Sequence, residues 1–186
     1  METAIGYKEW EVVCDALGTG DQVILLRKGG IHEGRDGFSF KHERFFLFPT
    51  RFHAQGEQVR VPCGVTGGEW QPGDVVPVRY FCEAVWAKTL TDWDEVLRLQ
   101  EQHIWNEELV RERFAWGEES EQGSIHCALV RVSRLEKPWE ITYEKKHGGC
   151  RTWVDLPDMP GDIIASATPV LDDAEFTRRQ VRVENG

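Results

Sequence analysis

The chain has 186 residues, 40% of them hydrophobic and 29% charged, a composition typical of soluble globular proteins. Its formal net charge of −10 disfavours indiscriminate binding to a nucleic-acid backbone or to an anionic membrane, because both attract cationic protein surfaces. No stretch reads as a signal peptide or as a membrane-spanning run, so we expect a soluble, cytoplasmic protein that does not bind membranes. The five cysteines form no C-x-x-C pair, and we expect reduced thiols, no metal and no cofactor.

The first third of the chain predicts one helix and two strands. Apolar spacing over residues 8–17 predicts a short amphipathic helix that ends at the glycine turn of residues 18–20. Residues 22–28 predict a strand that is buried on both faces. Alternation over residues 38–48 predicts a second strand, paired back on the first through the connection formed by residues 29–37.

The remainder predicts two further strands and a long helix. Residues 54–74 are rich in turn-forming residues, and "WQPGD" leads sharply into a strand over residues 75–89, with alternate residues from Val76 to Trp86 on one face. Thr91 is predicted to cap a helix over residues 92–116, whose first turn holds Asp92 and Asp94. Residues 124–134 predict a central strand that is apolar on both faces.

These elements predict an α+β fold with a mostly antiparallel, barrel-like sheet, one long helix and a short N-terminal helix. We expect a single domain over residues 1–170, with residues 171–186 as a C-terminal edge element or a frayed tail. The eight tryptophans mark the core and a possible stacking surface.

Positive charge is concentrated in one segment of this acidic chain. Between Arg27 and Arg60, seven lysines and arginines stand against four acids. Inside this segment, "LLRKGGIHEGR" places a Gly-Gly turn between cations. Such a turn lets backbone N–H groups approach an anion, and the flanking cations complete a cradle. The alternative is a hairpin connection whose charges face water. The candidate ligand-binding residues are Arg27, Lys28, Gly29, Gly30, Glu33, Arg35 and His53.

Two histidines invite different interpretations. His53 follows "FPTR" in a loop and is a candidate for ligand contact or proton transfer. His42 shares its predicted strand face with four phenylalanines, which favours a hydrogen-bonded core histidine. Together with Glu33 the two histidines could form a two-His-one-carboxylate metal face, which we hold as the lesser alternative.

Two possible nucleophiles complete the candidates. Thr50 could expose its hydroxyl at a strand end near the basic turn and react with a lysine as base, although ordinary turn or cap chemistry is favoured. Cys150 lies in "HGGCRTW", where cationic neighbours would lower a thiol pKa. The favoured alternative for Cys150 is a small residue packed under Trp153.

The segments "KEWEVVCDALGTGDQVILLRKGGIHE", "FFLFPTRFH" and "GGCRTWVDL" resemble a bacterial family known as domain of unknown function number 1802, over most of the chain. A looser resemblance is to the PUA-like barrel and its activating-signal-cointegrator homology domains, which carry G-x-K-x-x-E-x-R at the barrel mouth. Lys28, Glu33 and Arg35 resemble that motif, with a longer Lys-to-Glu gap and Leu26 in place of its glycine. This resemblance implies binding of RNA or modified bases, and a few relatives are hydrolases.

Two functions therefore compete. The first is a binding module for RNA, a modified base or a nucleotide, with the basic Gly-Gly turn at a barrel mouth. The second is a hydrolase acting on a nucleotide, a nucleic acid or an amide. In it, Lys28 or His53 would be the base, Glu33 the proton shuttle, and Arg27 or Arg35 the clamp on the transition state. A purely structural interaction domain is a third reading, and the oligomeric state stays open.

Overall fold

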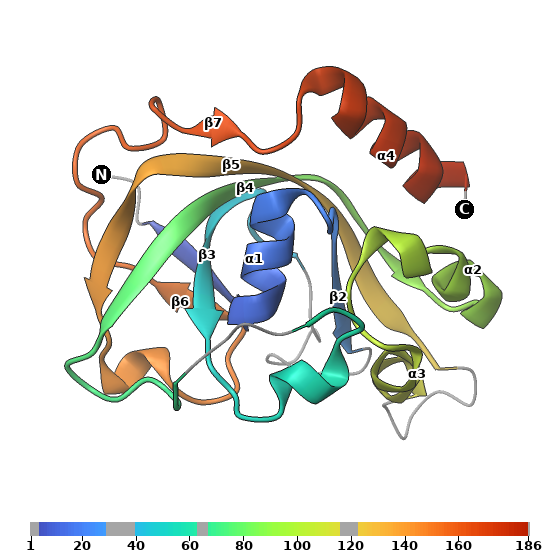
Figure 1. The fold of residues 1–186 in the computed structure, drawn as a ribbon, viewed down its shortest axis with the longest axis horizontal. Helices are drawn as coiled ribbons and strands as arrows, with labels where there is room; N and C mark the ends of the chain where they lie inside the picture. The colour runs from blue at the N-terminus through green and yellow to red at the C-terminus, as the bar shows by residue number, and fades with distance from the viewer. Residues whose placement is uncertain (1–3, 29–39, 63–66, 116–122, 186) are drawn as a thin grey trace.

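The computed structural model describes residues 4–28, 40–62, 67–115 and 123–185. Its centre is a curved, mostly antiparallel sheet in the order β2-β5-β4-β3-β1-β6, with β7 beside β5. The long strands β4 and β5 arch over helix α1 (Figure 1). The strands are β1 (Ile5–Trp10), β2 (Ile24–Lys28), β3 (Arg44–Thr50), β4 (Val75–Leu90), β5 (Ile125–Thr142), β6 (Trp153–Asp155) and β7 (Thr168–Pro169). The helices are α1 (Glu11–Thr19), α2 (Trp93–Arg98), α3 (Glu107–Ala115) and α4 (Asp173–Asn185), with 3₁₀ turns η1 (Gln55–Gln58), η2 (Gln100–Gln102) and η3 (Lys145–His147).

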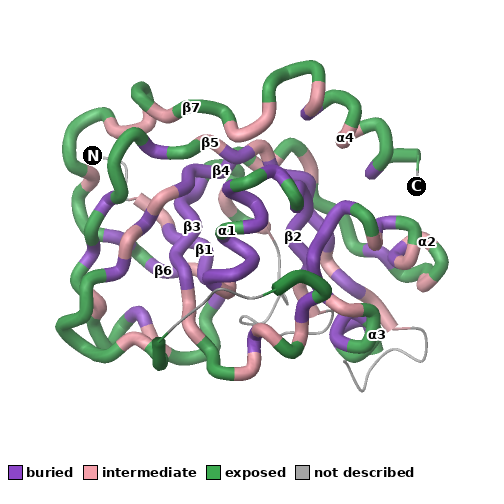
Figure 2. Tube along the Cα trace, in the orientation of Figure 1, coloured by how far each residue is buried: buried purple, intermediate pink, exposed green. Residues whose placement is uncertain are grey.

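The α+β class and the mostly antiparallel sheet are confirmed, but the predicted barrel-like sheet is not closed into a barrel. The strand path starts at β2 and stops at β6, and no strand pairing among the described residues joins these two edges. Strands β1 and β3 run parallel, which gives the sheet its mixed character. The buried positions gather on α1 and on the strands around it, whereas α4 and the outer turns are largely exposed (Figure 2).

The predicted pairing of the second strand with the first is also wrong. Strand β2 pairs with β5, and β3 pairs with β1 and β4. The second strand begins at Arg44 and continues to Thr50, while residues 29–37 of the expected connection lie outside the described residues. Strand β3 is central in the sheet, so apolar side chains cover both of its faces. Its partners β1 and β4 come from distant parts of the chain.

Two apolar cores lie on opposite faces of the sheet. The main core surrounds α1, and a second core holds Phe46 and Phe48 of β3 with Val76 and Val78 of β4. The strand over residues 75–89 is confirmed, but its expected single apolar face is not. A register shift between Val78 and Tyr80 places Tyr80 in the main core, because an irregularity of this kind reverses the faces that follow it.

The N-terminal helix is present but shifted. It begins at Glu11, because residues 5–10 pair with β3 as strand β1, which was not predicted. It ends at Gly20, whose positive φ of 82° provides the expected glycine stop.

The single long helix over residues 92–116 is wrong, since α2, η2 and α3 replace it. Asp92 caps α2 by accepting the Asp94 N–H at 2.8 Å, a role expected of Thr91. Asn106 accepts the Leu109 N–H at 2.8 Å and so starts α3 anew. After η2 the chain is extended at His103, and Trp105 pairs with Val59 in an isolated bridge while its side chain is fully buried.

The C-terminal part holds more regular structure than expected. Strand β5 continues through Pro138 to Thr142, and residues 173–185 form α4, where a frayed or edge element was expected. The side chains of Phe176 and Val183 are the buried ones of α4. The division into one domain over residues 1–170 and a terminal element stays a prediction. None of the described helices has both the length and the apolar character of a membrane span.

Candidate functional site

The predicted basic turn is described only at its start. Gly29, Gly30, Glu33 and Arg35 lie outside the described residues, so their cradle stays a prediction. Arg27 and Lys28 end β2 and are half-buried. Arg27 also lines a cleft of about 260 Å³.

This cleft lies where β1 passes into α1, beside the end of β3 and the segment of residues 148–152. Its charged lining comprises the cations Lys8, Arg27, Arg51 and Arg151 and the carboxylates Glu9 and Glu69. Its aromatic lining comprises Trp10, Trp70 and Tyr143. Cations and aromatic rings in one concave surface provide the chemistry to hold a small anionic molecule that carries a flat ring.

Lys8 is the most unusual cation of the cleft, because it is only 8% exposed. Its Nζ donates to the carbonyl oxygens of Gly149 at 2.6 Å and Gly148 at 3.3 Å. Burial lowers the pKa of Lys8, and the nearby charges of Arg27 and Arg151 lower it further. Within the described part of the chain, Lys8 forms no ion pair. A buried ammonium without a carboxylate is costly, so an entering anion would relieve the repulsion.

Arg27 is held at the back of the cleft by β1. Its Nε donates to the hydroxyl of Tyr7 at 2.8 Å, and its guanidinium also donates to the carbonyl of Lys8. The Tyr7 side chain is completely buried, and this burial raises its pKa well above the ordinary value. Tyr7 is therefore a neutral acceptor that orients Arg27 and leaves its charge in place.

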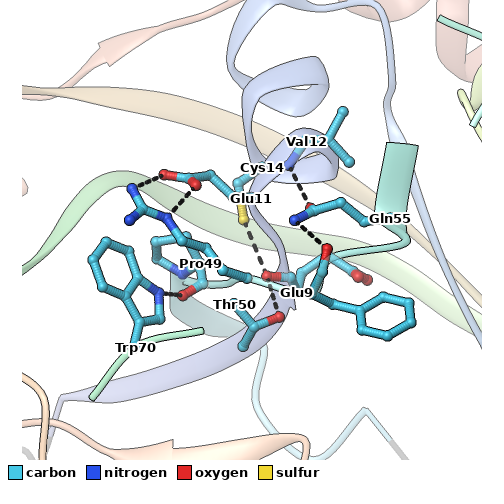
Figure 3. A network of polar contacts seen from close by, with 10 residues as sticks. Glu9, Glu11, Val12, Cys14, Pro49, Thr50, Gln55 and Trp70 are labelled. Carbon is cyan, nitrogen blue, oxygen red and sulfur yellow. Dashed lines mark hydrogen bonds and ion pairs between the residues drawn. The ribbon is translucent and has the colours of Figure 1, made fainter. Parts of the chain in front are cut away.

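One wall of the cleft is a fixed cation–aromatic stack. The guanidinium of Arg51 lies 3.7 Å from the ring centroid of Trp70. It donates to both carboxylate oxygens of Glu11, at 2.7 and 3.3 Å, and the indole Nε1 of Trp70 donates to the Pro49 carbonyl at 2.9 Å (Figure 3). These contacts fix the Trp70 ring, and Glu11 offsets much of the Arg51 charge.

Trp10 contacts the buried side chain of Arg113. The Arg113 guanidinium lies 5.1 Å from the Trp10 ring centroid and 4.9 Å from that of Trp105. Burial lowers the pKa of Arg113 to about 10, and the charge of Glu9 opposes this shift. Glu9 accepts the Trp10 N–H at 2.8 Å through Oε1, while its buried Oε2 has no hydrogen-bond partner among the described residues. Trp10 therefore packs against a buried guanidinium and also lines the cleft.

The other predicted candidates are placed as follows. Thr50 lines the cleft, but its hydroxyl donates to the Glu9 carbonyl at 3.1 Å. Cys150 also lines the cleft and is exposed, so the expected packing under Trp153 is wrong. Cys150 follows Gly149 in the segment that lines the cleft, and this position leaves its side chain exposed.

The two histidines lie apart from the cleft lining. His42 is half-buried before β3, and its ring packs edge-on against Trp153 at 4.9 Å. His53 is exposed and contacts Phe52, with ring centroids 4.8 Å apart. Among the described residues, no three or more of His, Cys, Asp and Glu are grouped so as to hold a metal ion.

Sequence reasoning singled out Arg27, Thr50 and Cys150 of this lining and missed most of the rest. The "YKEW" stretch was assigned partly to a helix, although its charged residues Lys8 and Glu9 are buried in a strand. In a strand, Tyr7 and Glu9 share one face and Lys8 and Trp10 share the other, so each face mixes an aromatic with a charged residue and the pattern carries no signal for a strand.

The structure is an α+β fold with a cleft that is lined by cations and aromatic rings. The family model "Domain of unknown function (DUF1802)" matches residues 6–182, and the chain belongs to this family, which confirms the resemblance drawn from the sequence. The comparison with curated proteins gave no match.

Solved structures similar to this chain are those of the ASCH protein of Zymomonas mobilis, ZmASCH. A serine-to-alanine mutant has a TM-score of 0.49 and 12% identity and covers 96% of this chain and 94% of its own. A tyrosine-to-phenylalanine mutant has a TM-score of 0.48 and 13% identity, with 97% of each chain covered. A structure described as ASCH from the same organism has a TM-score of 0.46 and 13% identity, with 96% and 94% covered.

Proposed function

We propose that the cleft binds one nucleotide unit, either a free nucleotide or a nucleotide within RNA. The observation that carries this proposal is the buried Lys8 ammonium, which lies near Arg27 and Arg151 without a carboxylate partner among the described residues. A phosphate group is an anion that accepts several hydrogen bonds at once, so these cations would stabilise it in the cleft.

The aromatic lining suits the base of the same nucleotide. Trp10 and Trp70 both line the cleft, and each ring contacts an arginine guanidinium. A base that stacks on a tryptophan is stabilised by about 1–3 kcal/mol, irrespective of its sequence identity. A phosphate and a base held together distinguish a nucleotide from a simple inorganic anion.

The charge distribution limits the ligand. The whole chain carries −10, whereas the cleft holds four cations and two carboxylates. Such a local site neutralises only one or two phosphates, which argues against long duplex DNA. We include in this proposal the turn that follows Arg27, so that Lys28, Gly29, Gly30, Glu33 and Arg35 would add contacts at the cleft edge.

The hydrolase alternative stays a prediction. In the described part of the chain, His53 is exposed and absent from the cleft lining, and the Thr50 hydroxyl is engaged by a backbone carbonyl. These contacts do not favour a nucleophile or a general base at the cleft, so the binding module is the function that we propose.

The test is a titration of the purified protein, followed by tryptophan fluorescence and calorimetry. The ligands are a nucleoside monophosphate, the matching nucleoside and inorganic phosphate. We expect the monophosphate to bind about tenfold or more tightly than either part alone. The affinity should fall with salt, with a slope of about 1 to 2 in the logarithmic plot, because few phosphates are neutralised.

The variant Arg151→Gln should weaken monophosphate binding about tenfold without unfolding the chain, since Arg151 is exposed. Arg178→Gln is the matched control, because Arg178 is an exposed arginine of α4 and does not line the cleft. Equal affinity of Arg151→Gln and wild type, or failure of every phosphate ligand to bind, would overturn the proposal.

A further inference from the structure

The rim of the cleft continues into an exposed aromatic ledge, formed by Trp10, Phe52 and His53. Thr50 and Arg51 line the cleft, and Phe52 and His53 are the next two residues of the chain. The Phe52 ring centroid lies 6.0 Å from that of Trp10 and 4.8 Å from that of His53. Phe52 is 37% exposed and is the one aromatic residue among the exposed large hydrophobic residues of the described chain.

Hydrogen bonds hold the loop that carries Phe52 in place. The Gln55 backbone N–H and its side-chain amide both donate to the Phe52 carbonyl, at 3.2 and 3.1 Å. The Gln55 side-chain oxygen in turn accepts the N–H of Val12, in the first turn of α1, at 3.3 Å (Figure 3). The Gln55 side chain is buried, so the loop is fastened to α1 while the aromatic ring stays in water.

An aromatic ring that is fixed and exposed next to a cationic cleft is the arrangement of a base-stacking platform. Trp10 belongs to both surfaces, because it lines the cleft and contacts Phe52. A ligand that fills the cleft with one nucleotide therefore reaches the ledge with the group attached to that nucleotide.

We propose that the Phe52–His53 part of the ledge stacks a second base, so that the ligand is a single-stranded oligonucleotide. This inference rests on the proposed function of the cleft and names its ligand class. A single strand fits because its bases are free to leave one another and stack on side chains, whereas bases of a duplex are stacked and paired. The acidic remainder of the chain disfavours a duplex that covers more of the surface.

The test compares three ligands: a nucleoside monophosphate, a dinucleotide that carries the same 5′-nucleotide and a second base, and a blunt duplex. Affinities are measured by calorimetry for wild type, Phe52→Ala, Phe52→Trp and Val85→Ala. Val85 of β4 is exposed and lies outside the cleft lining, so Val85→Ala is the control for loss of exposed apolar surface.

We expect wild type and Val85→Ala to bind the dinucleotide about tenfold more tightly than the monophosphate. Phe52→Ala should lose this gain and keep its affinity for the monophosphate, and Phe52→Trp should retain the gain. Thermal unfolding of each variant checks that the exposed position leaves the fold intact.

Two failures are distinguishable. If the monophosphate binds but the dinucleotide binds no better, or if Phe52→Ala keeps the full gain, the second-base site is overturned while the proposed function stands. If none of the ligands binds, the proposed function and the inference both fall. Equal affinity for duplex and single strand would also overturn the inference.

Discussion

Arg27 and Tyr7 join two strands that are not neighbours in the sheet. Arg27 ends β2 and Tyr7 lies in β1, with β5, β4 and β3 between these strands in the sheet order. Nevertheless the Arg27 Nε donates to the Tyr7 hydroxyl at 2.8 Å, and the guanidinium lies 4.8 Å from the Tyr7 ring centroid. The curved sheet therefore brings its two ends together through side chains, without closing its backbone pairing.

The substitution Tyr7→Phe removes the acceptor of this hydrogen bond and leaves the ring in place. Hydrogen bonds to charged groups contribute about 1.5–3 kcal/mol, so we expect the free energy of unfolding in urea to fall by about that amount. Nucleotide affinity should fall severalfold, because Arg27 loses its orientation. Tyr80→Phe is the matched control, because Tyr80 is also buried, lies outside the cleft lining and shows no hydrogen bond from its hydroxyl within the described residues. Equal effects of the two substitutions would contradict this account.

The sequence predicted the strands well where the apolar pattern was long and uninterrupted. Residues 22–28 and 124–134 were expected as strands buried on both faces, and β2 and β5 fill those positions. The pairing of β3 was not predictable from its own residues, because its partners β1 and β4 are distant in the chain or were unrecognised. Local pattern defines a strand, whereas its neighbours depend on the whole fold.

The prediction of one long helix over residues 92–116 was wrong for a different reason. Apolar residues from Trp93 to Phe114 keep a roughly helical spacing, but Asn106 is a better helix start than a helix interior residue. Its side chain caps α3, and the extended segment before it buries Trp105. Most of the cleft lining was missed because strand β1 was not predicted. Lys8 is recognisable as a buried cation only once β1 is known.

Glu11→Gln should destabilise the protein by about 1–3 kcal/mol in urea unfolding. Glu11 is 8% exposed, pairs with Arg51 at 2.7 Å and lies in the first turn of α1, where the helix dipole favours an anion. Loss of the pair should also release the Arg51–Trp70 stack, which is measurable as a change in tryptophan fluorescence.

The control is Glu107→Gln, which also removes the carboxylate of a Glu–Arg pair in the first turn of a helix. Glu107 pairs with Arg111 at 2.8 Å, but the two side chains are 47% and 57% exposed. Water screens such a pair, so the expected loss is about 0.5 kcal/mol or less. A loss as large as that of Glu11→Gln would show that burial is not the source of the difference.

Acid should destabilise the fold through His103. Burial lowers the pKa of His103 to about 3, with Arg60 and Arg113 adding to the shift. The unfolded imidazole titrates near 6.5, so below that pH the unfolded state binds a proton that the folded state does not. Stability is retained above pH 6.5 and is lost as the pH falls toward 3, at up to about 1.4 kcal/mol per pH unit.

The measurement is urea unfolding of wild type and His103→Gln at pH values from 7 to 4. The difference between the two unfolding free energies should narrow as the pH falls, because the variant lacks the proton-binding group. A constant difference over this range would contradict the assignment to His103.

Cys150 should be the fast-reacting thiol of the described cysteines. Cys14, Cys82 and Cys127 are buried, and burial raises the pKa of Cys127 to about 12. In a Cys63→Ser background, a thiol-specific dye should label one cysteine rapidly and the other three only after denaturation. Nucleotide should slow this labelling, because Cys150 lines the cleft. Rapid labelling of two or more thiols would contradict the burial pattern.

The contact between Lys8 and Gly149 spans 141 positions of the chain. One wall of the cleft is therefore synthesised 141 positions before the other. A growing chain that has not yet reached residue 148 holds Lys8 without the carbonyl groups that receive its ammonium. Prematurely terminated products thus lack the cleft, and only chains that extend past this segment compete for its ligand.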